Sequence, residues 1–162
     1  MKKIASFRIN HELLLPGLYV SRKDSFKDLI VTTFDLRFTR PNYEPVIDTA
    51  ALHAIEHLGA TFLRNNPEIK DDIVYFGPMG CRTGFYLIVA QDTTPQIIYP
   101  VILEMINYII NYEGIIPGAS SIECGNYLDL NLPMAKFYAK KYLEEVLDHF
   151  SSSRYEYPNM ND

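Results

Sequence analysis

The sequence predicts a single α+β domain, with an antiparallel sheet of about four or five strands and helices packed on one face. Residues 34–39 alternate between apolar and polar side chains, and this period of two is typical of a half-buried strand. Two further β-rich segments flank a loop that contains two glycines and a proline. Three segments with helical patterns do not alternate regularly with these strands, which favours α+β over a parallel α/β sheet.

Four segments are strand candidates. Residues 17–22 have the weakest pattern, and residues 29–39 carry the alternation described above. The polar residues of that alternation, Arg37 among them, would then lie on the more exposed face of the sheet. Arg37 is either an ordinary exposed residue of this face or a residue that orients a substrate. Residues 73–76 and 84–90 are rich in β-branched and aromatic side chains, and residues 77–83 form the loop between them.

Two of the three predicted helices have a simple starting position. Asp48 favours the N-cap of a helix that reaches about residue 65, because its carboxylate can accept a hydrogen bond from a free backbone N–H. Asn131 begins another helix, which reaches about residue 150. Residues 1–150 are therefore expected to form one domain. Residues 151–162 show no periodicity and are expected to be a mobile tail.

The middle helix carries more conflicting signals. Thr94 and Pro95 suit its N-cap and first position, and Gly114 suits its C-terminal cap. Pro100 lies inside the same segment. A proline there must kink the helix or move its start.

The composition excludes several functional classes. The chain has 162 residues, of which 48% are hydrophobic and 22% charged, as in ordinary globular domains. A net charge of −5 disfavours electrostatic binding to nucleic acid or to an anionic membrane. Two cysteines are too few for a secreted disulfide framework, and no segment reads as a signal peptide or a membrane span. We therefore expect a cytoplasmic protein with reduced thiols.

The most informative motif is His53-Ala54-Ile55-Glu56-His57. On a helix, His53 and His57 lie one turn apart on the same face, so both imidazoles can reach one metal ion. Glu56 stays beside them and can contact a metal-bound water without being a ligand. The spacing is the inverted order of the zincin motif. Short motifs recur by chance, so two ordinary histidines are the alternative interpretation.

A third ligand must come from elsewhere in the chain. Cys124 is the candidate, with its neighbour Glu123 as the nearest rival. One thiolate and two imidazoles suit Zn²⁺ or another borderline divalent ion, and they leave a fourth position open for water or substrate. The alternative is that Cys124 is a buried, inert thiol.

The second thiol, Cys81, lies in the loop between two predicted strands and is bracketed by glycines. Such a loop is a reasonable position for a reactive group, although a packing role is the alternative. Arg82 would lower the pKa of this thiol if its side chain points that way. If Cys81 also bound the metal, the site would be a closed structural site and not a catalytic one.

Taken together, these motifs resemble the S-ribosylhomocysteine lyase family, LuxS. Their order and spacing fit from about residue 4 to residue 147. The combination is far more specific than any single motif. The matching segments are Ser6-Phe7 with His11, Phe34-Asp35-Leu36-Arg37-Phe38 with Pro41-Asn42, His53-x-x-Glu56-His57-Leu58, Pro78-Met79-Gly80-Cys81-Arg82-Thr83-Gly84-Phe85-Tyr86, and Glu123-Cys124-Gly125.

The resemblance implies a homodimer with two equivalent active sites at its interface. The family's metal ligands correspond to His53, His57 and Cys124, with Fe²⁺ as the native ion and Zn²⁺ or Co²⁺ as substitutes. The implied reaction cleaves the thioether of S-ribosylhomocysteine. Its products are homocysteine, which the methyl cycle recycles, and 4,5-dihydroxy-2,3-pentanedione, the precursor of the quorum-sensing signal autoinducer-2.

The resemblance also implies roles for five further residues. The catalytic acid–base pair corresponds to Glu56 and Cys81, and the substrate contacts correspond to Ser6, His11 and Arg37. The chemistry agrees with this set, because thioether cleavage needs a carbonyl moved along the sugar and then β-elimination of the thiolate. Each step removes a proton beside a carbonyl, which calls for a Lewis acid and for general bases on both faces of the carbon.

One segment departs from the family pattern. Many family members carry Asp-Ile-Ser before the Pro-Met-Gly-Cys run, whereas this chain has Tyr75-Phe76-Gly77. A carboxylate that could meet the substrate's ammonium group is absent there. We expect backbone groups or another acid to hold the amino-acid end of the substrate.

Two other functions are compatible with the motifs. An inverted-zincin peptidase would use Glu56 as base and Glu113 or Glu123 as third ligand, but it would leave Cys124 without a role. A metal-stabilised interaction module would use Cys81 as a fourth ligand.

Overall fold

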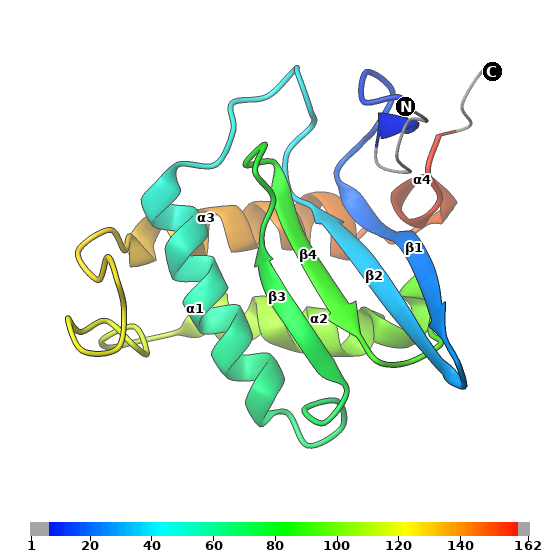
Figure 1. Ribbon diagram of the computed structural model, residues 1–162. Helices are drawn as coiled ribbons and strands as arrows, with labels where there is room; N and C mark the ends of the chain where they lie inside the picture. The colour runs from blue at the N-terminus through cyan, green and yellow to red at the C-terminus, as the bar shows by residue number, and fades with distance from the viewer. Residues whose placement is uncertain (1–6, 159–162) are drawn as a thin grey trace.

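The structure is a computed structural model that describes residues 7–158. Its sheet consists of β1 (Gly17–Phe26), β2 (Leu29–Arg37), β3 (Ile73–Pro78) and β4 (Gly84–Val89), all antiparallel and in the order β1-β2-β4-β3 (Figure 1). The predicted antiparallel sheet is therefore confirmed, with four strands. The first strand extends further than its weak pattern indicated, because it forms a hairpin with β2 along its whole length.

Three long helices cover one face of this sheet (Figure 1). They are α1 (Thr49–Asn65), α2 (Pro95–Asn111) and α3 (Leu132–Tyr142), and α3 continues into a π-helical turn, η2 (Leu143–Leu147). The N-cap predicted at Asp48 is confirmed for α1, and Asn131, the predicted start of α3, is its N-cap. Asp48 accepts a hydrogen bond from the backbone N–H of Ala51, and Asn131 accepts one from that of Met134. Each cap satisfies a donor that the first helical turn leaves free.

The predicted end of the second helix was wrong. α2 begins at Pro95 and continues through Pro100, but it ends at Asn111, before Gly114. Tyr112 leaves the helix in an extended conformation, and its hydroxyl donates a hydrogen bond to the carbonyl of Ile115. Gly114 still has φ +105°, so it serves the loop that follows the helix and not the helix end.

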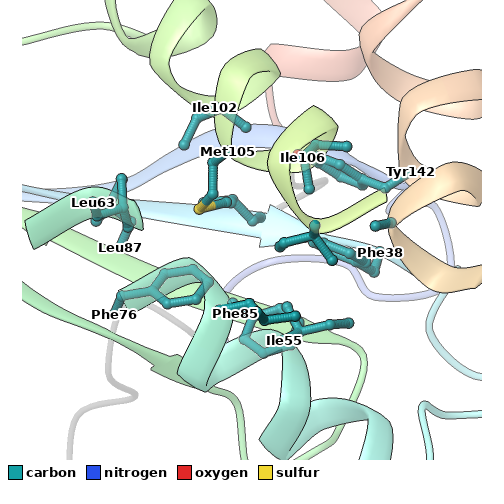
Figure 2. Close-up of a cluster of buried hydrophobic side chains, with 14 of the residues drawn as sticks. Phe38, Ile55, Leu63, Phe76, Phe85, Leu87, Ile102, Met105, Ile106 and Tyr142 are labelled. Atoms are coloured by element: carbon teal, nitrogen blue, oxygen red, sulfur yellow. The ribbon is translucent and has the colours of Figure 1, made fainter. Parts of the chain in front are cut away.

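The main core lies between the sheet and the three helices (Figure 2). Phe85 and Leu87 of β4 face Ile55 of α1 and Met105 of α2 across it. Each such buried side chain stabilises the fold by about 1.5–3 kcal/mol relative to exposure. Because Ile55 and its apolar neighbours fix one face of α1 on the sheet, the adjoining face of that helix is held rigidly at the edge of the core.

The second face of the sheet is not the exposed face that the alternation predicted. Asp35 and Arg37 of β2 keep only 1% and 2% of their surface exposed. The reason is the segment that was expected to be a mobile tail. Its described part, residues 151–158, contains α4 (Ser152–Tyr155) and packs on β1, where Tyr157 stacks on Tyr19. β2 is therefore covered from both sides.

Among residues 7–158, no helix is both long enough and apolar enough to cross a membrane.

Candidate metal centre and thiol site

Helix α1 carries the His-x-x-Glu-His motif on the face beside its core stripe. His53 and His57 are half-buried, and their ring centroids lie 4.6 Å apart. Glu56 is also half-buried and lies between them in sequence. The predicted helix thus places both imidazoles on one face, as the spacing of four residues requires.

Both imidazoles are oriented by the loop between α2 and α3, which is yellow in Figure 1. Nδ1 of His53 lies 2.9 Å from the carbonyl oxygen of Asp129, and Nδ1 of His57 lies 2.7 Å from that of Pro117. A carbonyl oxygen can only accept, so each Nδ1 must carry the proton. Each Nε2 is then an unprotonated nitrogen whose lone pair can bind a metal ion.

The same loop brings Cys124 to these two rings, although it lies 71 residues from His53 in the sequence. Its Sγ is 3.3 Å from Nε2 of His53. Ligand atoms of His53, His57 and Cys124 all lie within 4.8 Å of one another. The backbone N–H of Asn126 donates a hydrogen bond to this sulfur over 3.4 Å.

This donor set fits a divalent metal ion. Two neutral imidazoles and one thiolate provide three ligands of the kind found at zinc and related transition-metal sites, and three protein ligands leave a position open. The two carbonyl groups that accept from Nδ1 supply the outer hydrogen bonds that such histidines usually have. Among the described residues, the cluster does not include the rival ligands Glu113 and Glu123, nor Cys81. Glu123 instead accepts a hydrogen bond from Ser120.

Gly118 allows the loop to approach His57 closely. It has φ +73°, a conformation that residues with a Cβ atom rarely adopt. A Cβ at this position would lie 3.1 Å from Nδ1 of the His57 ring. Sequence analysis did not single out Gly118, because neither its backbone angle nor its neighbour could be derived from the local pattern.

Cys81 lies in a separate group of polar side chains at the end of β2 and β4. Its sulfur is 3.1 Å from the hydroxyl of Thr83 and 3.7 Å from Nη1 of Arg37. Burial raises the pKa of this thiol, but the hydrogen bonds of Thr83 and the charge of Arg37 lower it by more, so its net pKa is below the ordinary value. Cys81 itself is exposed, as a reactive thiol must be.

The cation next to Cys81 is therefore Arg37 and not Arg82, the neighbour that the sequence suggested. Arg37 donates from Nη2 to Asp35 over 2.5 Å and from Nη1 to Thr83 over 2.6 Å. Burial alone lowers the pKa of Arg37, but the charge of Asp35 raises it by more, so the guanidinium stays charged. Sequence reasoning missed Asp35 and Thr83; the available signal was that Asp35 and Arg37 share one face of a strand.

The predicted site residues line two different cavities of the chain. His11 and Cys81 line one of about 610 Å³, beside the unpredicted Thr83, and His53 and Glu56 line another of about 350 Å³. The loop that carries Cys81 contributes to both, because Gly80 and Arg82 border the second cavity. Ser6, a predicted substrate contact, lies outside the described residues.

The segment that departs from the family pattern lies in β3. Phe76 points into the core, and Gly77 is buried beside it. Tyr75 is 48% exposed on the opposite face of the sheet. None of the three supplies a carboxylate to either cavity.

Comparison with known proteins agrees with this geometry. A family profile described as S-ribosylhomocysteinase (LuxS) matches residues 4–153. Among its curated relatives, a protein of Clostridium beijerinckii named S-ribosylhomocysteine lyase is 57% identical over 159 residues, which cover 98% of this chain and 100% of that one. Proteins with the same name from Clostridium acetobutylicum and Borreliella burgdorferi are 56% and 51% identical, each over 98% of this chain. The chain therefore belongs to the S-ribosylhomocysteinase (LuxS) family.

Proposed function

We propose that this protein is an S-ribosylhomocysteine lyase, a carbon–sulfur lyase that releases homocysteine and 4,5-dihydroxy-2,3-pentanedione, the precursor of autoinducer-2. The observation that carries this proposal is the identity of 51–57% to relatives with that name, over 98% of the chain. The same matches exclude the peptidase and the interaction module as better alternatives. Two free cysteines are consistent with a reducing, cytoplasmic location.

The metal would be held by His53, His57 and Cys124. We propose Fe²⁺ as the native ion, with Zn²⁺ or Co²⁺ as substitutes, and the mixed nitrogen and sulfur donors support a borderline divalent ion of this kind. When bound, such an ion supplies Lewis acidity for a carbonyl oxygen of the substrate. The hydrogen bonds to Asp129 and Pro117 keep both imidazoles in the tautomer that can bind it.

Glu56 and Cys81 are the proposed acid–base residues. Because its pKa is lowered, the Cys81 thiol forms a thiolate more readily than an ordinary cysteine, and that thiolate can take a proton from a carbon next to a carbonyl. Arg37 and Thr83 stabilise that thiolate by charge and hydrogen bonding. The carboxyl group of Glu56, next to the metal ligands, can hold and return a proton on the other side of the substrate. His11 and Ser6 are proposed as substrate contacts, together with Arg37, whose Nη1 lies 3.7 Å from the sulfur of Cys81.

We further propose a homodimer whose sites combine both chains. The two cavities support this, since His11 and Cys81 line one and His53 and Glu56 line the other. Apolar side chains of the loop that holds Cys124 are also exposed, with Ile122 at 96%. A second copy that covered this loop would remove them from water and could bring the Cys81 cavity to the metal ligands.

The activity test uses metal-loaded protein, S-ribosylhomocysteine and a thiol reagent that detects homocysteine as it forms. The wild type should release homocysteine. Cys81→Ala should keep its metal and fold but lose cleavage, since the thiolate is not a ligand in this assignment. Absence of homocysteine release by the metal-loaded wild type would refute the proposal. If Cys81→Ala loses metal together with activity, a closed four-ligand site is the better interpretation.

Subunit mixing tests the shared site. An inactive Cys81→Ala chain and an inactive Glu56→Gln chain are combined and allowed to exchange subunits. Half of the dimers are then mixed, and about a quarter of all sites carry neither defect, by counting on a two-fold interface. Recovery of that fraction of activity is expected. No recovery after confirmed exchange would mean that each site is built from one chain.

A further inference from the structure

After α4 the chain reaches back to the covered face of the sheet, where Tyr157 makes a specific contact. The ring of Tyr157 stacks on that of Tyr19, with centroids 4.7 Å apart and planes within 15°. Its hydroxyl donates a hydrogen bond of 2.8 Å to Oδ2 of Asp35. Tyr19 and Asp35 are cross-strand neighbours on β1 and β2, so Tyr157 covers both. Neither the function assigned to Cys81 nor the metal centre uses this contact.

Asp35 is the buried partner of Arg37, and the pair has few other hydrogen-bond partners. Arg37 donates from Nη2 to the same oxygen that accepts from Tyr157. Within the described part of the chain, Oδ1 of Asp35 and Nε of Arg37 have no hydrogen-bond partner. A buried carboxylate is costly unless hydrogen bonds and an opposite charge compensate for the lost water. The Tyr157 hydroxyl is thus one of only two side-chain donors on this carboxylate among residues 7–158.

The other terminal nitrogen of the Arg37 guanidinium, Nη1, faces the Cys81 thiol. Nη1 donates to the hydroxyl of Thr83 over 2.6 Å and lies 3.7 Å from the sulfur of Cys81. Thr83 in turn contacts that sulfur over 3.1 Å. An unbroken series of contacts therefore runs from the carboxy-terminal segment to the thiol, through one guanidinium group whose two ends face Asp35 and Cys81.

We propose that Tyr157 is a positioning residue for Cys81: by sharing Oδ2 of Asp35, its hydroxyl keeps Arg37 placed to stabilise the Cys81 thiolate. Without that hydroxyl, Arg37 alone must satisfy the buried carboxylate. The guanidinium then turns its Nε toward Oδ1 of Asp35, two atoms that are unpaired among the described residues, and this moves Nη1 away from the sulfur. This inference rests on the proposed function, because Cys81 matters for turnover only if it takes part in the reaction.

Tyr157 keeps its proton over the whole working range of pH. Burial and the negative charge of Asp35 hold the pKa of its hydroxyl well above the ordinary value, so it remains a donor. The other titratable groups that act on Cys81 or line its cavity come from several elements, and their charge must be considered in any pH profile. They are Arg37 of β2 with its partner Asp35, Tyr86 of β4, and His11, Tyr43 and Glu44 of the loops.

The experiment compares Tyr157→Phe with the matched variant Tyr155→Phe. Tyr157→Phe keeps the ring that stacks on Tyr19 and removes only the hydroxyl. Tyr155 lies in the same segment and its ring packs on Phe150, with centroids 5.1 Å apart, so its variant controls for general effects on that segment. The rate of alkylation of Cys81 by iodoacetamide is measured against pH, with mass spectrometry of the Cys81 peptide to separate it from Cys124. The pH dependence of turnover is measured on the same proteins.

Tyr157→Phe should move the midpoint of Cys81 ionisation upward by about half a pH unit, which is about a threefold loss of reactivity at pH values well below the midpoint. The low-pH side of the plot of turnover against pH should shift to higher pH by the same amount. Tyr155→Phe should leave both unchanged. An unchanged midpoint in folded Tyr157→Phe overturns the inference, and so does an equal shift in Tyr155→Phe, since that would indicate general loosening.

The two readouts also separate this inference from the proposed function. If the alkylation midpoint shifts in Tyr157→Phe but Cys81→Ala remains active, Tyr157 positions the thiol as inferred and the proposed role of Cys81 is wrong. If Cys81→Ala is inactive and Tyr157→Phe has the wild-type midpoint and profile, the lyase assignment stands and the inference fails. Should Tyr157→Phe unfold, the midpoint of Cys81 ionisation is measured in Thr83→Val instead. An unmoved midpoint in that variant would overturn the inference, because the series of contacts reaches the sulfur through Thr83.

Discussion

Replacing Gly118 with alanine tests how the loop after α2 holds His57, a proposed metal ligand. Gly118 follows Pro117, whose carbonyl oxygen accepts from Nδ1 of His57 over 2.7 Å. The new Cβ would lie 3.1 Å from this nitrogen and 3.2 Å from Cε1 of the ring. Contacts this short require the ring or the loop to move by a few tenths of an ångström. Either movement disturbs the hydrogen bond that orients the ligand.

The magnitude has two parts. Alanine at φ +73° costs about 1–2 kcal/mol of backbone strain, which lowers the free energy of unfolding. Disturbing the hydrogen bond that orients a metal-bound histidine typically lowers metal affinity 10–100-fold, which is about 1.4–2.7 kcal/mol. Gly118→Ala should therefore lose both stability and metal affinity.

Gly114→Ala is the matched control for this experiment. Gly114 lies in the same loop with φ +105°, but a Cβ there would meet no atom within 4 Å. It should lose stability by a similar amount and keep its metal affinity. The assay is competition for Zn²⁺ with a chromophoric chelator under reducing conditions, together with denaturant unfolding. Wild-type metal affinity in Gly118→Ala, or an equal loss in Gly114→Ala, would refute this account of the site.

Three further predictions follow from the geometry. His57→Ala and Cys124→Ala should each purify with little metal, measured by elemental analysis, because either leaves only two ligands of the cluster; full metal content in one of them would contradict the assignment. Alkylation of Cys81 in the wild type should rise with pH through a midpoint below that of an ordinary cysteine, because Thr83 and Arg37 lower the thiol pKa; an ordinary or higher midpoint would show that burial dominates. Asp48→Ala should lower the free energy of unfolding by about 1 kcal/mol, with Asp48→Asn close to wild type, since only the former removes the cap of α1; equal losses in denaturant unfolding would assign the effect to charge.

Local sequence determined the framework of the candidate metal centre. The cap at Asp48 and the spacing of His53 and His57 depend only on residues within one or two helical turns, so they could be predicted without knowledge of the fold. The hairpin loop that carries Cys81 was also recognisable from its glycines and proline. The resemblance of several such motifs in order then indicated the family, which the comparisons confirmed.

Tertiary structure decided what these residues face. Cys124 contacts His53 although the two lie 71 residues apart in the sequence. The cation that reaches Cys81 is the distant Arg37 and not Arg82, which follows Cys81 in the sequence. The alternation in β2 predicted one exposed face, yet Tyr157 covers that face and binds Asp35. A period of two records only that successive side chains point to opposite sides of a strand. Whether the second side meets water or a distant segment depends on where the rest of the chain packs, and no local pattern contains that information.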